Sequence, residues 1–411
     1  TIRSNNGRFY MVTTNDTTHK NFFFYTDDIP GEWSDPITID QDGIDPSLYF
    51  EDGRAFFISN GTDCEGKGGV VQCEINIETG EKLTESRCIW QGSGGRYLES
   101  PHMYKIGKYY YLMAAEGGTE YGHMITYARS ESVWGKFEGY PHNPVLTNRN
   151  KAPFIIQGIG HGDLIQDKNG EWHIICLGFR QIHMWMTYHH LGRECFLIPV
   201  TFHEDGWFTA GNGTCEESYE LSGDFAQLPL KTYTLENIGH DICHLRHPHT
   251  ENYSITKDKI TLKGTDVTLD DVASPTFAGV RQRDFDMDCS VSVSVSDGEG
   301  GLTVYSCETE HYDLALRKNE GGYEAILRLN IGGIRHIEKA VQISSGSAKL
   351  IIRSDSQVYK FFVQSQGEEI PMGFAMSKYL SSEVCGGFTG TVIGMYAVKG
   401  SAEFTDLRIS Y

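Results

Sequence analysis

In Gly107-Lys108-Tyr109-Tyr110-Tyr111-Leu112 a turn glycine precedes a run of strand-forming residues. A glycine of this kind between apolar runs is typical of a β-hairpin. The pattern recurs along the first half of the chain, at intervals of 46 to 63 residues. Repeated hairpins at such intervals predict the blades of a β-propeller. The other copies are Gly7-Arg8-Phe9-Tyr10-Met11-Val12, Gly53-Arg54-Ala55-Phe56-Phe57-Ile58 and Gly170-Glu171-Trp172-His173-Ile174-Ile175.

The repeat also aligns polar residues. Eight residues before the turn glycines at 53 and 107 stand Asp45 and Glu99. The corresponding position before Gly170 is Gly162, and it is flanked by His161 and Asp163. Each position opens the innermost strand of a blade, so we expect Asp45, Glu99 and His161 around one central pocket. Two alternatives remain open: the acids only cap turns, and His161 is a hydrogen-bonded core residue.

The second half has a different pattern. The hairpin repeat is lost between about 216 and 255, which predicts a crossover into another domain. Beyond it, runs such as Ser290-Val291-Ser292-Val293-Ser294-Val295 alternate polar and apolar residues. Alternation with period two, joined by glycine-rich turns, favours a two-sheet β-sandwich. We place a partial propeller at 1–222 and the sandwich at 223–411.

The net charge of the chain limits the classes of partner that it can bind. The chain carries 35 Lys and Arg against 55 Asp and Glu, a net charge of −20. This excess repels phosphate backbones and anionic lipids, so we expect no nucleic-acid and no membrane partner. No apolar run reaches the roughly 18 residues of a membrane helix. A neutral sugar would not be repelled.

The ten cysteines contain no Cys-x-x-Cys pair. Cys176 and Cys195 lie in apolar runs and are predicted to be buried thiols. This usage favours a reducing compartment, so we expect a cytoplasmic protein. The alternative, a secreted or periplasmic protein, is favoured weakly by glycosylation-type tripeptides at Asn15, Asn60, Asn212 and Asn252.

Several stretches together resemble glycoside hydrolase family 43, whose five-bladed propellers act on xylosides and arabinosides. The resemblance implies an all-β chain: a five-bladed β-propeller followed by a concanavalin-like β-sandwich. It also implies an inverting exo-glycosidase that releases xylose, and in some members arabinose, from xylo-oligosaccharides or arabinoxylan fragments. The matching stretches are Ile44-Asp45-Pro46-Ser47-Leu48-Tyr49-Phe50, Leu98-Glu99-Ser100-Pro101-His102, Gly160-His161-Gly162-Asp163-Leu164, Leu191-Gly192-Arg193-Glu194, Lys378-Tyr379-Leu380-Ser381-Ser382-Glu383-Val384 and Gly386-Gly387-Phe388-Thr389-Gly390.

The resemblance also implies residue roles. Glu99 would be the general acid, and Asp45 would orient it. A carboxyl beside a second carboxyl resists ionisation, so Glu99 could hold a proton near neutral pH. His161 resembles the axial histidine that helps hold a hydrated cation, usually Ca²⁺. No organic cofactor is expected.

Three further residues are candidates for binding substrate. Arg193 resembles the arginine that hydrogen-bonds sugar hydroxyls. Arg180 is a weaker candidate for the same wall, and a surface ion pair is the alternative. Phe388 lies on the sandwich loop that reaches over the pocket mouth in relatives, and a core phenylalanine is the alternative.

One departure concerns the general base, which relatives carry as an Asp in a Pro-Asp-Pro-Ser-like stretch. The only Asp-Pro-Ser here is at 45, and its surroundings match the third acid. Thr1-Ile2-Arg3 corresponds to a stretch inside the second blade, so we expect the first blade to be largely missing. An inverting enzyme needs both carboxyl groups. The alternative function is therefore an inactive, carbohydrate-binding propeller. The sandwich could also bind sugar or only pack against the propeller, and its edges allow a homo-oligomer.

Overall fold

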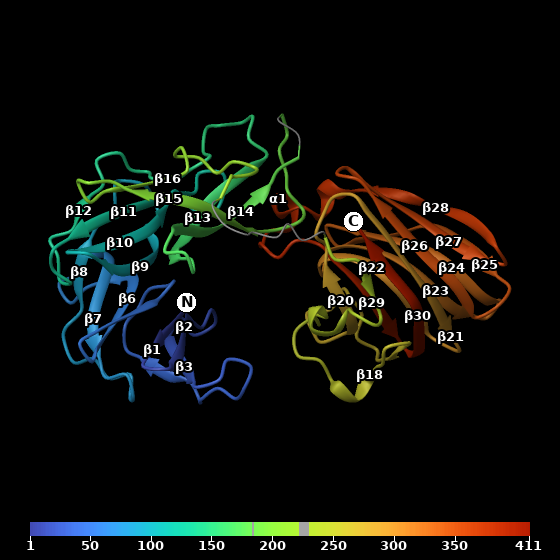
Figure 1. Ribbon diagram of the computed structural model, residues 1–411. Coiled ribbons are helices and arrows are strands. Elements are labelled where there is room, and N and C mark those ends of the chain that lie inside the picture. Colours follow the sequence, from blue (N-terminus) through green and yellow to red (C-terminus); the bar gives the residue numbers. More distant parts are fainter. Residues whose placement is uncertain (183–184, 222–229) are drawn as a thin grey trace. The chain divides into compact units, whose positions relative to one another are not determined.

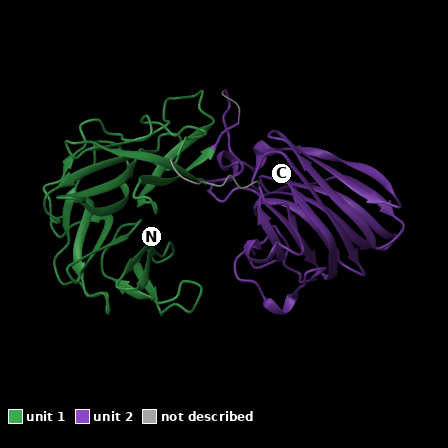
Figure 2. Cartoon of the chain, viewed as in Figure 1, with its two compact units in different colours: residues 1–179, 194–225 green, residues 180–193, 226–411 purple. Residues whose placement is uncertain are grey.

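The computed structural model describes residues 1–182, 185–221 and 230–411. The chain forms two compact units, drawn in different colours in Figure 2. Unit 1 comprises residues 1–179 and 194–225, and unit 2 comprises 180–193 and 226–411. The predicted boundary between 222 and 223 lies outside the described residues.

Unit 1 consists of antiparallel sheets in which each strand pairs with the next along the chain (Figure 1). Among its described residues there are four such sheets of four strands. They are β1 (Ile2–Asn5), β2 (Arg8–Thr14), β3 (Asn21–Thr26) and β4 (Ile37–Ile39); β5 (Ser47–Glu51), β6 (Arg54–Thr62), β7 (Gly68–Ile75) and β8 (Arg87–Trp90); β9 (Glu99–Ile106), β10 (Tyr109–Glu116), β11 (Met124–Ser130) and β12 (Glu138–Gly139); and β13 (Ile156–Gln166), β14 (Trp172–Arg180), β15 (Glu194–Phe202) and β16 (Phe208–Ala210).

The turn glycines join the first two strands of each sheet, as the repeat predicted. At the turn between β5 and β6, Asp52 and Gly53 have φ of 52° and 76°. At the turn between β1 and β2, Asn6 and Gly7 have φ of 51° and 83°. Two positive φ values in a two-residue loop match the right-handed twist of the flanking strands, which explains Asn-Gly and Asp-Gly here. The hairpins are therefore fixed by local sequence.

The first strands of the four sheets lie next to one another. β1 contacts β5, β5 contacts β9, and β9 contacts β13. An ion pair between Arg3 on β1 and Asp163 on β13 joins the first and the fourth sheet. The innermost strands thus gather around one centre, and the propeller arrangement predicted from the repeat is confirmed.

Unit 2 is a sandwich of two antiparallel sheets, as predicted (Figure 1). Its core lies between them and is built from alternating buried residues such as Val291, Val293, Leu350 and Ile352. One sheet contains β17 (Tyr233–Thr234), β18 (Tyr253–Ile255), β19 (Ile260–Gly264), β21 (Met287–Val295), β26 (Ser347–Ser354), β27 (Val358–Ser365), β28 (Glu368–Met376) and β30 (Gly400–Ser410). The other contains β20 (Thr276–Arg281), β22 (Glu299–Cys307), β23 (Glu310–Asn319), β24 (Gly322–Ile331), β25 (Ile334–Ile343) and β29 (Val392–Val398). The short helix α1 spans Ser382–Cys385.

Two other expectations from the sequence concern membrane-spanning segments and the burial of Cys176 and Cys195. Within the described residues, no helix is both long and apolar enough to cross a bilayer. Cys176 is buried, as predicted. Cys195 is exposed, so the prediction that it is buried is wrong. Cys195 lies on β15, where outward-facing and inward-facing residues alternate, so an apolar run alone did not decide its side.

Candidate active site

Two short motifs meet where β5 and β9 begin. Ser100, which follows Glu99, donates its hydroxyl hydrogen to Asp45 Oδ2 at 3.1 Å. In the reverse direction, Ser47 donates its hydroxyl hydrogen to the Pro101 carbonyl oxygen at 2.6 Å. The stretches Asp45-Pro46-Ser47 and Glu99-Ser100-Pro101 are therefore cross-linked by two side-chain hydrogen bonds. The two acids that the repeat aligned thus lie in directly connected segments.

The backbone at these positions is unusual. Asp45, Ser100 and His161 have φ of 53°, 55° and 45°, a region that non-glycine residues rarely occupy. In β9, Glu99 pairs with Ala115 and His102 with Met113, so two residues of β9 face one residue of β10. A bulge of this kind redirects a side chain, and strained backbone tends to persist at functional sites. Three of the four innermost strands thus carry a left-handed residue at or beside the aligned position.

A cavity of about 360 Å³ opens beside these strand starts. This volume lies in the range usual for small-molecule sites. Asp45 and His161 both line it, so two of the residues aligned by the repeat share one cavity. Glu99 is half-buried at the start of β9 and is not among the residues of its wall. The other lining residues are Thr1, Val12, Thr13, Thr14, Asp16, His19, Ile44 and Pro46.

An ion pair fills the centre between the innermost strands. Arg3 donates from Nη1 and Nη2 to the two carboxylate oxygens of Asp163, at 2.8 and 2.9 Å. Tyr104 on β9 also donates its hydroxyl hydrogen to Asp163. Burial acts to raise the pKa of Asp163, but Arg3 and the hydrogen bonds hold it below its ordinary value. The bidentate geometry makes this one of the stronger types of charged contact.

His102 completes the central group. Burial lowers the pKa of its imidazole to about 3; the Asp163 carboxylate opposes this shift, and Arg3 and His161 add to it. The ring is therefore neutral near pH 7. Its Nδ1 lies 2.9 Å from Nη2 of Arg3. Because a guanidinium only donates, Nδ1 accepts and the hydrogen of the neutral ring is on Nε2.

The residues around His161 fit a directly coordinated calcium ion poorly. Ca²⁺ takes six to eight oxygen ligands, and His161 offers a nitrogen. Asp163, two residues further along β13, already binds Arg3 and Tyr104 through both oxygens. Among the described residues, no group of three closely spaced His, Cys, Asp or Glu ligand atoms includes His161. A positive guanidinium also lies within this central cluster.

Arg193 and Phe388, both in unit 2, contact each other. The guanidinium of Arg193 lies 3.7 Å from the centre of the Phe388 ring. The Arg193 amide donates to the Phe388 carbonyl at 3.1 Å. Phe388 is 46% exposed, so the alternative of a core phenylalanine is wrong. The structure thus joins two of the predicted substrate-binding residues into one stacked pair.

The segment that precedes Arg193 is fixed to the loop that carries Phe388. His189 donates its amide to Glu383 at 3.0 Å, and its Nδ1 lies 2.8 Å from the same carboxylate. A Cβ on Gly192 would lie 2.5 Å from the Gly390 nitrogen, and a Cβ on Gly390 would lie 2.2 Å from the Leu191 carbonyl carbon. Both glycines also have positive φ. The two backbones can pass each other only because both positions lack a side chain.

Arg180 forms the ion pair considered as its alternative. Its Nη1 lies 3.4 Å from Asp284 Oδ1, and its Nη2 donates to the Arg283 carbonyl at 2.9 Å. The guanidinium also lies 5.0 Å from the centre of the Phe285 ring. These contacts lie within unit 2, and a role of Arg180 in substrate binding stays a prediction.

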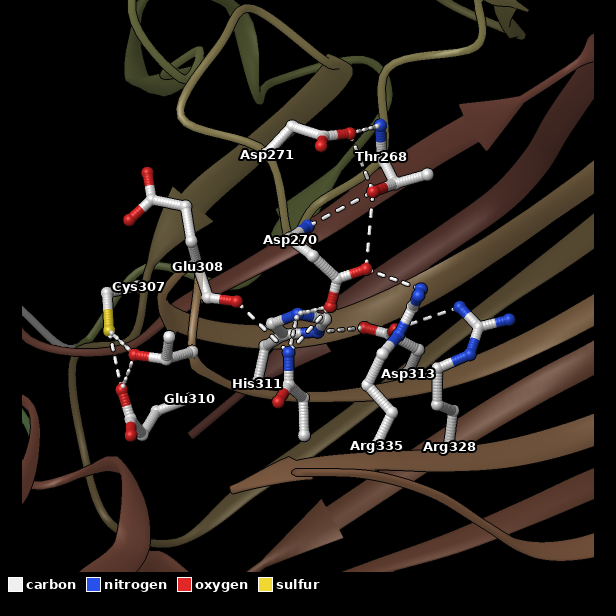
Figure 3. A network of polar contacts seen from close by, with 12 residues as sticks. Thr268, Asp270, Asp271, Cys307, Glu308, Glu310, His311, Asp313, Arg328 and Arg335 are labelled. Atoms are coloured by element: carbon white, nitrogen blue, oxygen red, sulfur yellow. Dashed lines mark hydrogen bonds and ion pairs between the residues drawn. The ribbon is translucent and has the colours of Figure 1, made fainter. Parts of the chain in front are cut away.

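The sandwich contains a second charged group, shown in Figure 3. His311 lies between two carboxylates, with Nδ1 at 2.8 Å from Asp313 and Nε2 at 3.2 Å from Asp270. Burial opposes protonation of His311, but the two aspartates prevail and raise its pKa to about 9. A cavity of about 340 Å³ borders this group, lined by residues including Asp270, Asp313, Arg328 and Arg335. Sugar binding by the sandwich stays a prediction.

Sequence reasoning missed several residues of the site. Ser47 and Ser100 were not predicted as site residues, although both stand in the motifs that identified the acids. Arg3 escaped notice because its partner is 160 residues away and no local pattern marks the pair. A signal was present for Asp163, which flanks the aligned position before Gly170.

Comparison with known proteins follows the same division of the chain. Residues 1–208 match the family described as glycosyl hydrolases family 43. Residues 231–408 match the beta xylosidase C-terminal concanavalin A-like domain. Both matches agree with the sheets that the structure contains.

Relatives match over nearly the whole chain. A non-reducing end alpha-L-arabinofuranosidase of Bacteroides ovatus, BoGH43B, is 36% identical over 97% of this chain and 77% of its own. A xylosidase/arabinosidase of Butyrivibrio fibrisolvens is 30% identical over 97% and 81%. The solved structure of Bacteroides ovatus xyloglucan PUL GH43B has a TM-score of 0.90 at 34% identity and covers 100% of this chain and 84% of its own. That of the xylan beta-1,4-xylosidase from Bacillus halodurans C-125 has a TM-score of 0.89 at 26% identity and covers 100% and 86%.

Proposed function

The chain belongs to glycosyl hydrolase family 43, and we propose that it is a glycoside hydrolase that removes terminal pentoses from xylan fragments. In this proposal it is an inverting, exo-acting enzyme that releases xylose, with arabinose as a second product. Relatives named as xylosidases and arabinofuranosidases support the class of sugar. The substrates are xylo-oligosaccharides or arabinoxylan fragments.

One observation carries the proposal: Ser100 connects Asp45 to the segment that begins with Glu99. In the proposed reaction, the protonated Glu99 gives its hydrogen to the glycosidic oxygen as the bond to the anomeric carbon breaks. Water adds to that carbon from the opposite face and passes a proton to a general base. Asp45 keeps Glu99 oriented. We assign the base to none of the residues described.

Arg193 and Phe388 supply the proposed wall for the sugar. A guanidinium held over an aromatic ring keeps a fixed direction, and guanidinium N–H groups are donors suited to the hydroxyls of a pentose. The exposed face of Phe388 offers apolar surface to the sugar ring. Arg180 stays a weaker candidate for the same role.

A hydrated calcium ion at His161 also stays a proposal. In view of the poor fit to direct coordination, the ion would be hydrated and held at His161 through its water ligands, and we assign no step of the reaction to it. Isothermal titration of the protein with CaCl2 tests this. Heat that is lost in the His161→Ala variant supports the ion, and the absence of heat in the unsubstituted protein refutes it.

Hydrolysis of aryl β-D-xyloside and aryl α-L-arabinofuranoside by the protein tests the main proposal. Loss of a general acid typically costs about 10²–10⁴ in rate, so Glu99→Gln should lower turnover by this factor. Binding of xylobiose should change little, because glutamine has nearly the same shape. Equal turnover in Glu99→Gln and the unsubstituted protein would remove Glu99 from this role.

The second candidate is a propeller that binds sugar without cleaving it. It is favoured by the single Asp-Pro-Ser of the sequence, at 45, which leaves the base unassigned. The same assay separates the two functions. Xylobiose binding with no cleavage of either aryl glycoside would replace the enzyme proposal by this one, and measurable cleavage would exclude it.

A further inference from the structure

Two cysteines and a glutamate of the sandwich lie close together. Cys307 ends β22 and Glu310 begins β23, so they flank the turn of one hairpin. Cys385 ends α1. One ligand atom from each lies within 4.8 Å of the other two. Figure 3 shows the Cys307 and Glu310 side chains directed toward each other.

The surroundings of Glu310 are chemically informative. The residue is only 5% exposed. Its Oε2 receives hydrogen bonds from Cys307 Sγ, at 2.8 Å, and from the Thr309 hydroxyl. Its Oε1 accepts the Gly332 amide at 3.0 Å. None of these three donors carries a positive charge, so the partners bound to the carboxylate do not neutralise it. Buried charges are usually paired or bind a metal ion.

The two thiols also lie close to each other. A hydrogen bond joins the Cys307 and Cys385 side chains. The thiolate is the form of cysteine that binds metals. Binding of a metal ion would release the thiol protons, so that the ion would lie among two thiolates and a carboxylate.

We propose that Cys307, Glu310 and Cys385 bind one zinc ion. Zinc takes cysteine sulfur and carboxylate oxygen in a tetrahedral arrangement. Bond lengths of about 2.3 Å to sulfur and 2.0–2.2 Å to oxygen put ligand atoms about 3.5–3.8 Å apart. The observed limit of 4.8 Å between the three ligand atoms needs only small side-chain movements to reach that geometry. Water or the Thr309 hydroxyl would supply the fourth ligand.

Sulfur ligands select zinc over harder cations. Ca²⁺ and Mg²⁺ prefer oxygen ligands and would gain little from two thiolates. A second group of potential ligands, Asp167, Glu171 and His173, lies in unit 1, contains no sulfur and includes the exposed Glu171. It provides a control site for the same measurements.

The zinc ion would fix the loop that carries Phe388. Cys385 precedes Gly386 and Gly387, which have φ of 70° and 72°. Phe388 follows directly and stacks on Arg193. Joining Cys385 to the β22–β23 hairpin through zinc would therefore anchor the start of this loop to the sheet.

The experiment is metal analysis of the whole protein, grown with added zinc and purified without chelator. We expect about one zinc per chain by plasma mass spectrometry. After removal of zinc, one equivalent of Co²⁺ should produce the near-ultraviolet charge-transfer band of thiolate–cobalt bonds. Cys307→Ser and Cys385→Ser should lose this band, Glu310→Gln should bind Co²⁺ at least tenfold more weakly, and Glu171→Gln should behave as the unsubstituted protein.

The unsubstituted protein alone can refute the proposal, even if a cysteine variant fails to fold. Zinc at background level together with no charge-transfer band would overturn it. The proposal would also be overturned if the purified protein had a molecular mass two hydrogens below that of the reduced chain, as a Cys307–Cys385 disulfide would produce. A band that is lost in Glu171→Gln and kept in both cysteine variants would overturn it too.

Discussion

Ser100 donates a hydrogen bond of 3.1 Å to the carboxylate of Asp45, and this contact joins two strand starts that are 55 residues apart in sequence. Because Ser100 follows Glu99, the bond fixes the segment of the proposed acid to the residue proposed to orient it. The pairing makes Ser100 a positioning residue.

Replacing Ser100 with alanine should reduce kcat on aryl xyloside about threefold to tenfold and leave KM nearly unchanged. A hydrogen bond to a charged group contributes about 1.5–3 kcal/mol, and we expect less than this in kcat because Ser100 acts on Glu99 only through the backbone. The matched control is Ser47→Ala, which removes the neighbouring bond to the Pro101 carbonyl without touching Asp45. It should lower stability and spare kcat. Equal losses of kcat in both variants would argue for a merely structural role of Ser100.

Breaking the Arg3–Asp163 pair should destabilise the protein. Arg3→Met leaves Asp163 charged and largely buried without its bidentate partner, and we expect a loss of about 3 kcal/mol. Urea unfolding measures it. The double variant Arg3→Met/Asp163→Asn should lose less free energy of unfolding than the sum of the losses in the two single variants, because no charge remains unpaired. Strict additivity would show that the contact contributes little.

The pH dependence of the free energy of unfolding should reflect the protonation of His311. Its pKa is raised from 6.5 to about 9 in the folded protein, so the stabilisation is fully present below about pH 6.5. It should be lost as pH rises through about 9, by an amount of the order of 3 kcal/mol. Asp270, Asp313 and Arg328 face the same group and stay charged across this window.

Unfolding in urea at several pH values between 6.5 and 9.5 tests this expectation. His311→Asn should flatten the decline because asparagine does not titrate. The control is His336→Asn, whose ring is exposed, and which should keep the slope of the unsubstituted protein. An identical slope in His311→Asn would assign the decline to other groups.

Replacing Phe388 with alanine should raise KM for aryl xyloside about twofold to fivefold. The stacked pair with Arg193 is partly exposed, and such contacts contribute about 0.5–1 kcal/mol. Val384→Ala removes a comparably exposed side chain from α1 and should leave KM unchanged. If Val384→Ala raises KM as much as Phe388→Ala does, the effect belongs to the loop as a whole.

Sequence predicted the sheets and part of the site because both depend on local or periodic signals. The hairpin glycines have a fixed role in tight turns, and equal spacing aligned Asp45, Glu99 and His161. The left-handed backbone at Asp45, Ser100 and His161 has no such signal, since none of the three is glycine. The contact of Arg3 with Asp163 depends on closure of four sheets, which no local window contains. Cys195 shows that an apolar run does not by itself decide which side of a strand is buried.

The close approach of Gly192 to Gly390 limits how this protein can be redesigned. Residues 386–391 form the loop between α1 and β29 that carries Phe388, and randomising them would be one way to alter the proposed sugar contacts. Any side chain at 390 would push against the backbone beside Arg193, so changes there would alter two loops at once. A library that holds both glycines constant would sample sugar contacts, whereas one that varies either would mostly sample misfolded chains.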